Sequence, residues 1–128
     1  MIGEGGPTSV FQAELEKVLS RIPGSLSATL VDVEGIALAS YSADNTLNAD
    51  VVAAELAAMA KGMKRVFEAL ATGRLQEFMF TTDRAVIVTR AVGTEFFLYI
   101  VLKDEKSLGL SRVETKRLSK DLEKALLL

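Results

Sequence analysis

The side chains that this sequence lacks limit its chemistry as much as those it contains. None of the 128 residues is a His or a Cys. Without His there is no Ser-His-Asp triad, and the commonest general base and metal ligand is missing. Without Cys there are no disulfides, thiolate metal sites or cysteine nucleophiles. Carboxylates and lysines could still serve, but the sequence disfavours an enzyme with acid–base machinery of its own.

Phosphate-binding loops need glycine, and two stretches of the sequence contain it. They are GEGG at residues 3–6 and VGTEF at residues 92–96. Neither has the spacing of a P-loop or its lysine. We therefore expect no nucleotide site and no cofactor in this chain, and we expect any nucleotide to belong to a partner.

The composition is that of an ordinary globular domain. Its 17 acidic and 15 basic residues give a net charge of −2, which predicts neither nucleic-acid binding nor strong membrane binding. No apolar run reaches the roughly 18 residues of a membrane span, and residues 1–8 lack the basic start of a secretory signal. We expect a cytoplasmic protein without direct membrane insertion, with a flexible lead-in at 1–8 and one domain at 9–128.

Capping patterns and apolar spacing predict a helix at each end of the domain. The first covers about residues 8–22, where Ser9 with Gln12 resembles a capping box. The last begins at a second capping box, formed by Ser111 and Glu114, and runs to the C-terminus. The first helix has an apolar stripe at helical spacing, which contains Val10, Phe11, Leu15, Val18, Leu19 and Ile22.

A third helix is predicted between them, at about residues 48–72, with Asn48 as its N-cap and Gly73 just past its end. At about 100° per residue its large apolar side chains form one arc, which we expect to lie on a sheet. The arc contains Val52, Leu56, Met59, Met63, Val66, Phe67 and Leu70. Two sets of small residues lie outside it: Ala53, Ala57 and Ala60 on its flank, and Ala54, Ala58 and Gly62 nearly opposite, among Lys61 and Arg65.

Five strands complete the predicted fold. The segment 95–102 is apolar on both faces, so we expect it in the middle of a sheet covered on both sides. A turn from Asp32 to Gly35 joins the first two strands. The resulting order, α-β-β-α-β-β-β-α, predicts an α+β fold with a five-stranded antiparallel sheet between helices. The strands are expected at residues 26–31, 36–41, 75–82, 85–91 and 95–102.

The strand at 75–82, LQEFMFTT, has the features of an unprotected edge. Phe78 and Phe80 alternate with other side chains, and neither Pro nor Lys interrupts the segment. Such an edge is a template for pairing with another chain. We therefore expect Phe78 and Phe80 at a dimer interface.

Three segments together give the chain a resemblance to the Roadblock family, the fold of the dynein Roadblock-type light chains. RIPGSLSATLVDVEGIALAS at residues 21–40 joins a helix end to two strands through a DxxG turn. AAELAAMAKGM at 53–63 and KSLGLSR at 106–112 match the later helices. The resemblance covers about residues 10–125 and is greatest to the bacterial MglB-type branch.

This resemblance implies a Roadblock/profilin-like sandwich that forms homodimers or heterodimers. It implies that the strands corresponding to 75–82 pair edge to edge and that the helices corresponding to 48–72 pack side by side. The dimer would then be a platform for a small Ras-like GTPase, with a role in bacterial cell polarity or motility. In the MglB branch it would activate GTP hydrolysis without supplying an arginine finger.

The resemblance also suggests roles for the two sets of small residues. Ala53, Ala57 and Ala60 would contact the twin helix, although helix propensity alone also explains them. The outward set would be the landing site of the GTPase, although an ordinary solvated face is an equal alternative. That set contains Ala54, Ala58 and Gly62, with Lys61 and Arg65 at its rim.

The sequence gives less reason to assign a function to the remaining basic residues. Arg84 and Arg90 are expected in a turn and on a strand surface, and we assign neither a catalytic role. A basic row on the last helix is most simply a solvated face beside Asp121 and Glu123; contact with an acidic partner is the alternative, and sparse aromatic residues disfavour nucleic acid. The row contains Arg112, Lys116, Lys120 and Lys124.

Three functional hypotheses follow. The first is a homodimeric regulator of a small Ras-like GTPase, acting as an allosteric GTPase activator. The second is a non-catalytic scaffold or adaptor for a GTPase or a motor-associated complex. The third is a small-ligand sensor, which is weaker because no polar cluster converges among the apolar positions.

Overall fold

A computed structural model describes residues 7–43 and 48–126 of the chain. Most of the predicted lead-in at 1–8 lies outside these residues, and its last two positions already belong to the first helix. The order of helices and strands agrees with the prediction. The elements are α1 (Pro7–Leu19), β1 (Ser25–Asp32), β2 (Ala37–Ser42), α2 (Ala49–Leu70), β3 (Glu77–Thr81), β4 (Val86–Val92), β5 (Phe96–Leu102) and α3 (Leu108–Ala125).

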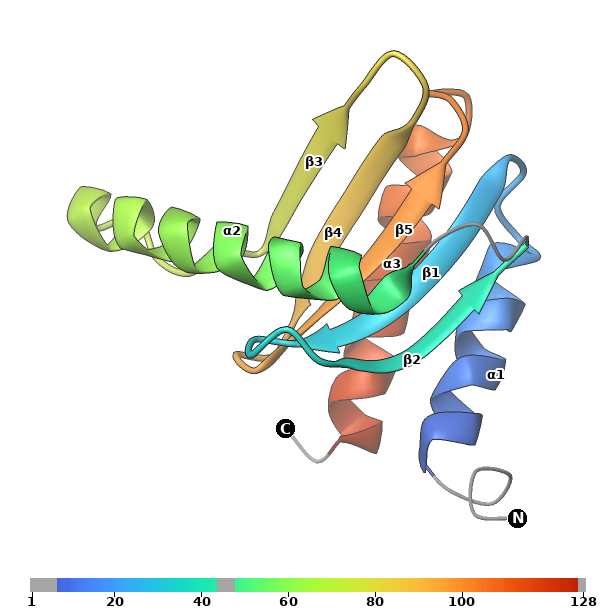
Figure 1. Ribbon diagram of the computed structural model, residues 1–128, viewed down its shortest axis with the longest axis horizontal. Helices are drawn as coiled ribbons and strands as arrows, with labels where there is room; N and C mark the ends of the chain where they lie inside the picture. The colour runs from blue at the N-terminus through green and yellow to red at the C-terminus, as the bar shows by residue number, and fades with distance from the viewer. Residues whose placement is uncertain (1–6, 44–47, 127–128) are drawn as a thin grey trace.

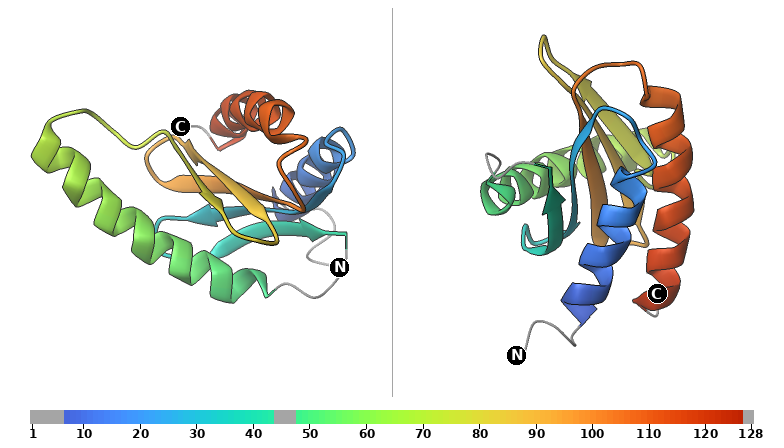
Figure 2. Two further views of the ribbon diagram at one scale, coloured as in Figure 1. Left: turned by 90° about the horizontal axis from the view of Figure 1, so that it is seen from above. Right: turned by 90° about the vertical axis from the view of Figure 1, so that its right-hand side faces the viewer.

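The strands form one antiparallel sheet in the order β2-β1-β5-β4-β3. β5 is the central strand, as its apolar sequence predicts. Helices α1 and α3 cover one face of the sheet, and α2 crosses the other (Figures 1 and 2). The α+β fold with a five-stranded sheet between helices is therefore confirmed.

The two faces of the sheet bury cores of different size. The core under α1 and α3 contains sixteen buried hydrophobic residues, among them Leu15, Ile100 and Leu122. The core under α2 is smaller: its cluster of buried residues consists of Val31, Ala53, Leu56, Tyr99 and Val101, with partly buried side chains such as Phe78 and Phe97 packed against it. Burial there raises the pKa of the Tyr99 phenol above its ordinary value. Helix α2 is therefore held to the sheet by much less apolar surface than α1 and α3 are.

Both predicted capping boxes are wrong, because both helices begin earlier. Ser9 lies inside α1, which starts at Pro7. Ser111 lies inside α3, where it is buried and its Oγ donates a hydrogen bond to the carbonyl of Leu108 at 2.7 Å. The residue before α3 is Ser107, and its hydroxyl donates to the carbonyl of Pro23 at 2.7 Å instead of capping the helix.

Other local predictions are confirmed or corrected in detail. Asn48 caps α2 by accepting a hydrogen bond from the N–H of Val51 at 3.2 Å. Val10, which we expected in the apolar stripe of α1, is 58% exposed, whereas the other members of that stripe are buried. Ile36 is 63% exposed and precedes β2.

The β1–β2 turn packs closely against α2. The Asp32 carboxylate accepts hydrogen bonds from the N–H groups of Glu34 and Ile36 at 2.9 and 3.0 Å. Gly35 has φ +94°, and a Cβ atom there would lie 3.1 Å from the Cα of Ala54. The small residues of α2 therefore allow the backbone of this turn to pack directly beneath the helix.

We predict that Gly35→Ala will lower the free energy of unfolding by more than Gly73→Ala does. Both glycines have φ +94°, so both substitutions cost about 1–2 kcal/mol in backbone strain. Only Gly35 lies against another backbone, and the displaced α2 should cost about a further 1–3 kcal/mol. Chemical denaturation of the two variants measures the difference. Equal losses would show that the contact of the turn with α2 contributes nothing.

Candidate interaction surfaces on the second helix and the third strand

The alanines that we expected at the twin-helix contact are buried inside the protomer. Ala53, Ala57 and Ala60 are 0%, 4% and 6% exposed. Ala53 and Ala57 lie against the β1–β2 turn, and all three side chains leave little surface for a second copy. The prediction that these three residues form a dimer interface is therefore wrong.

The large apolar arc of α2 is also turned differently from our prediction. Leu56 is buried as expected, but Met59, Val66 and Leu70 are 41%, 54% and 62% exposed. The reason is visible in Figure 1, where the C-terminal half of α2 extends beyond the edge of the sheet. We call the side of this half that carries Met59, Val66 and Leu70 the apolar overhang.

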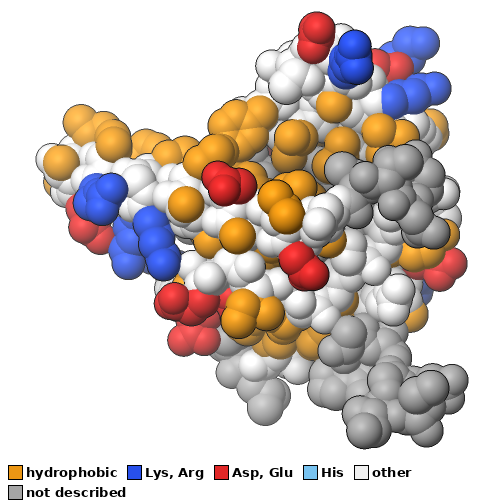
Figure 3. All heavy atoms as spheres, in the orientation of Figure 1, with side chains coloured by type: hydrophobic (Ala, Val, Ile, Leu, Met, Phe, Trp, Pro, Cys, Tyr) orange, Lys and Arg blue, Asp and Glu red, His pale blue; other side chains and the backbone are white. Residues whose placement is uncertain are grey.

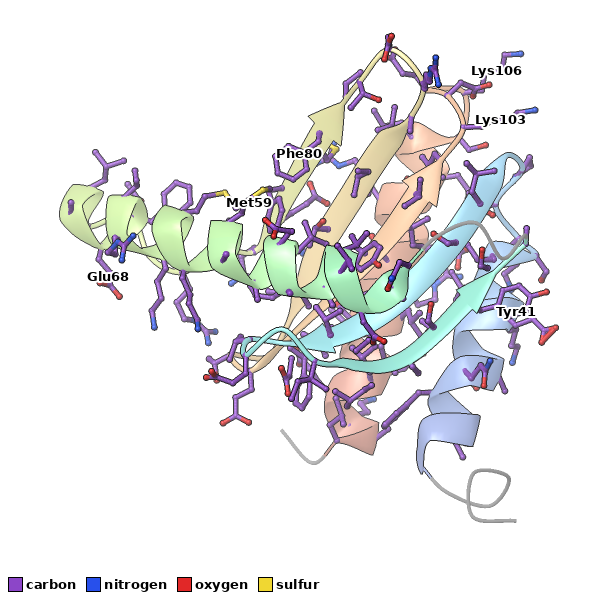
Figure 4. All side chains as sticks on the ribbon, in the orientation of Figure 1. Tyr41, Met59, Glu68, Phe80, Lys103 and Lys106 are labelled. Carbon is purple, nitrogen blue, oxygen red and sulfur yellow. The ribbon has the colours of Figure 1, made fainter. Side chains whose placement is uncertain are left out.

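Strand β3 is an edge of the sheet, and among the described strands it pairs with β4 alone. Phe78 is half-buried and makes edge-to-face contacts with Phe80 and Phe97, with ring centroids 5.5 and 6.1 Å apart. Met59 of α2 and Phe80 of β3 both face the angle between the helix and the strand (Figure 4). An unpaired strand edge and an uncovered apolar helix side thus occur together.

An ion-pair network fixes β3 from its other face. The Glu77 carboxylate accepts hydrogen bonds from Arg90 at 3.1 Å and from the Nε and Nη2 atoms of Arg112 at 3.0 and 2.7 Å. These bonds raise the pKa of Arg112 above its ordinary value. Arg112, which we expected in a free basic row, is therefore engaged within the protomer.

The rest of the basic row lies on α3, across the sheet from α2 (Figure 2). Lys116, Lys120 and Lys124 are exposed there, and none forms an ion pair with a described residue. Glu123, expected beside them, instead accepts a hydrogen bond from the N–H of Gly93 at 3.0 Å. The row therefore does not belong to the surface formed by α2 and β3.

The outward residues of α2 remain accessible. Ala54, Ala58 and Arg65 are exposed, and Gly62 is half-buried. Lys61 lies toward the β1–β2 turn, where its Nζ atom is 3.7 Å from the Glu34 carboxylate. Because both side chains are mostly exposed, this ion pair contributes little to stability. The structure brings these five positions to one half of the helix surface, with Lys61 at its border.

Membrane and metal sites are not indicated by the described residues. None of the helices within 7–43 and 48–126 is long and apolar enough to cross a membrane. In the same part of the chain, no three acidic side chains gather closely enough to hold a metal ion.

Comparison with known proteins decides the family. The Roadblock/LC7 domain matches residues 11–102. This chain belongs to the Roadblock/LC7 domain family. No curated protein sequence matches it.

Solved structures of MglB proteins have the same fold. MglB from Myxococcus xanthus is 17% identical, covers 94% of this chain and 98% of its own, and superposes with a TM-score of 0.86. The gliding protein MglB from Thermus thermophilus is 25% identical, with coverage of 93% and 90% and a TM-score of 0.84. An MglB with a tetrameric arrangement is 24% identical, with the same coverage and TM-score. The Roadblock/LC7 chain described here is therefore MglB-like.

No contact within the protomer explains Gly62, because a Cβ atom there would meet nothing within 4 Å. We predict that Gly62→Ala will raise the free energy of unfolding by about 0.5–1 kcal/mol, since Ala loses less backbone entropy in a helix. Chemical denaturation at a concentration where the protein is monomeric measures this effect. A loss of stability would mean that the protomer itself requires Gly at this position.

Proposed function

We propose that this Roadblock/LC7 protein is a homodimeric regulator of a small Ras-like GTPase, and that it stimulates GTP hydrolysis by its partner. The family and the MglB-like fold support a Roadblock-type regulator or adaptor. The observation that carries the finer proposal is the position of the apolar overhang beside the free edge of β3. These features give the protomer a surface to share with a second copy and leave the outward face of α2 for a GTPase.

The proposed dimer pairs the β3 strands of two copies. A two-fold axis beside β3 would extend the sheet from one protomer into the next. The apolar overhang of each α2 would then lie over the sheet of the other copy, near Phe78 and Phe80. Met59, Val66 and Leu70 replace the buried alanines as the helix residues of this interface. An MglB of similar structure forms a tetrameric arrangement, which supports self-association in this fold.

The proposed GTPase site is the outward face of α2, formed by Ala54, Ala58 and Gly62 with Lys61 and Arg65 at the rim. At about 100° per residue, Ala54, Lys61 and Arg65 lie about 120° or more around the helix from the apolar overhang, so dimerisation would leave them free. Ala58 lies about 100° from the overhang, and Gly62, about 60° from it, would border the dimer contact. Small side chains allow close approach of a partner surface, and the two cations favour an acidic one. In the dimer, the two outward faces would lie side by side.

The proposed mechanism is a shift in the conformation of the GTPase. Arg90 is held by Glu77 within its own sheet, and Arg84 lies in the exposed β3–β4 turn. Neither residue lies on the proposed docking face, so the proposal includes no arginine finger. Docking would instead favour the arrangement of the GTPase switch segments that is competent for hydrolysis.

A scaffold that binds a GTPase without changing its rate is the alternative proposal. It shares the dimer and the docking face, so only turnover distinguishes the two functions. A small-ligand sensor is less favoured. The structure has a groove between α2, the β1–β2 turn and the β4–β5 turn, but the polar side chains around it are all exposed. A ligand-dependent rise in melting temperature would be its signature.

The dimer is tested by Val66→Lys. Val66 is 54% exposed in the protomer, so the fold should tolerate a lysine there. In an apolar seam the buried ammonium should weaken the dimer at least about tenfold, which corresponds to about 1.4 kcal/mol. Sedimentation equilibrium measures the dissociation constant. Val113→Lys is the matched control, because Val113 is also 54% exposed but lies on α3, across the sheet. If both variants dimerise like the wild type, the apolar overhang is not part of the interface.

The GTPase site is tested by Ala58→Arg. The added side chain extends into water in the free dimer, so stability and dimerisation should not change. It would obstruct a docked GTPase, so the affinity for the GTPase should fall at least about tenfold, which corresponds to about 1.4 kcal/mol. Binding and GTP turnover are measured with a small Ras-like GTPase from the same genome, and Ala13→Arg on the exposed side of α1 is the control.

The wild type must be measured in the same assay. Faster turnover supports the activator, and binding without faster turnover supports the scaffold. Full binding and stimulation by the Ala58→Arg dimer would refute the outward face of α2 as the docking surface.

A further inference from the structure

A groove of about 340 Å³ lies beneath α2, at the point where the helix leaves the sheet. Its other borders are the β1–β2 turn, the β4–β5 turn and the segment that joins α2 to β3. Basic side chains gather along this lower side of α2, next to acidic side chains of the β1–β2 turn (Figure 3). This volume is at the lower end of the range for ligand-binding pockets.

The wall of the groove is apolar and its charges lie at the mouth. Ala57, Ala60, Phe67, Leu75 and Phe97 contribute to the wall. Its charged side chains are all exposed, and they are Glu34, Lys61, Lys64, Glu68 and Arg74. Sites for small polar ligands place a few polar groups inside the pocket. An apolar interior with a polar rim is instead the anatomy of a protein–protein contact.

The charges at the mouth favour an acidic occupant. Lys61 is already paired with Glu34 at 3.7 Å. Lys64 and Arg74 form no ion pair with any residue in 7–43 and 48–126, and Glu68 is the one other carboxylate at the mouth. Two unpaired cations therefore face a single unpaired anion.

The groove lies on the opposite side of α2 from the apolar overhang. At about 100° per residue, Lys61, Lys64 and Glu68 are about 180° around the helix from Met59, Val66 and Leu70. A second copy bound to the apolar overhang would leave the groove open. A site here is thus separate from the proposed dimer contact, and it shares only Lys61 with the proposed GTPase site.

We propose that this groove binds a short segment of a partner protein in which a large apolar side chain is flanked by carboxylates. The apolar side chain enters beneath Phe67 and Phe97, where it is removed from water. The carboxylates remain at the mouth and pair with Lys64 and Arg74. Because these pairs are exposed, they act on specificity and association rate more than on total affinity, and added salt weakens binding.

The experiment uses the full-length protein and a displayed library of random 12-residue peptides. The enriched peptides are synthesised, and their affinity is measured by fluorescence anisotropy. We expect sequences with Asp or Glu beside a large apolar residue. The double substitution Lys64→Glu with Arg74→Glu should weaken binding at least about tenfold.

Two further variants separate the groove from general charge effects. Lys116→Glu with Lys120→Glu makes the same change in net charge on α3, and it should leave the affinity unchanged. Glu68→Gln removes the one unpaired anion at the mouth and should tighten binding by about threefold, within the range of exposed ion pairs. A gain of affinity cannot result from misfolding.

The proposal is overturned if the library yields no acidic peptides, or if the two double variants weaken binding equally. It is also overturned if Val66→Lys abolishes peptide binding, because the peptides would then occupy the apolar overhang. GTPase stimulation is measured separately, so failure of the groove leaves the proposed regulator intact, and the reverse also holds.

Discussion

Helix α2 is longer than the surface that it covers, and the interaction surfaces of this protein follow from that mismatch. Its 22 residues span about 33 Å. Its last buried residue is Ala60, so the ten residues from there to its end have no continuous support beneath them. Because α2 loses contact with the sheet at about its midpoint, its C-terminal half exposes both its apolar side and its charged side. One becomes the apolar overhang, and the other becomes the roof of the groove.

The contact at Gly35 determines where this mismatch occurs. The β1–β2 turn reaches the helix at Ala54 and Ala57, so the first half of α2 is fixed to the sheet. The core beneath it is small, and Leu56 is the one large side chain of α2 among its buried residues. In the proposed dimer a second copy would cover the apolar overhang. This contact would remove from water the apolar surface of α2 that the protomer leaves exposed. The dimer would then stabilise the element that carries the docking face.

Much of the fold could be predicted from the sequence because it depends on local patterns. The doubly apolar segment 95–102 identifies the central strand, and Asn48 is a strong N-cap. The capping boxes failed because both helices begin before the serines that we took as caps. Pro7 is favoured at the first position of a helix, and Ser107 directly precedes α3. Both residues were visible in the sequence and could have corrected the helix starts.

The rotation of α2 could not be predicted in the same way. Helical periodicity gives the angles between side chains but not the direction of the sheet. We placed the sheet under the largest apolar residues, whereas the buried residues centre about 80° away, on the alanines. The small size of Ala53, Ala57 and Ala60 allows the turn and the sheet to approach, and this tertiary contact outweighs the arc of larger side chains. The small residues next to the core arc were therefore core themselves, and the exposed Met59, Val66 and Leu70 became candidates for an interface.

Lys61 connects the two proposed docking surfaces. It belongs to the rim of the outward face and also to the mouth of the groove. In the protomer it pairs with Glu34, but the side chains are 59% and 72% exposed, so separating them costs little free energy. Either partner could therefore recruit Lys61 without loss of stability in the protomer. If both partners bound together they would compete for one cation, and each would bind less tightly in the presence of the other by the same factor. The groove would then be more than a second binding site, because its occupation would lower the affinity of the same protomer for the GTPase.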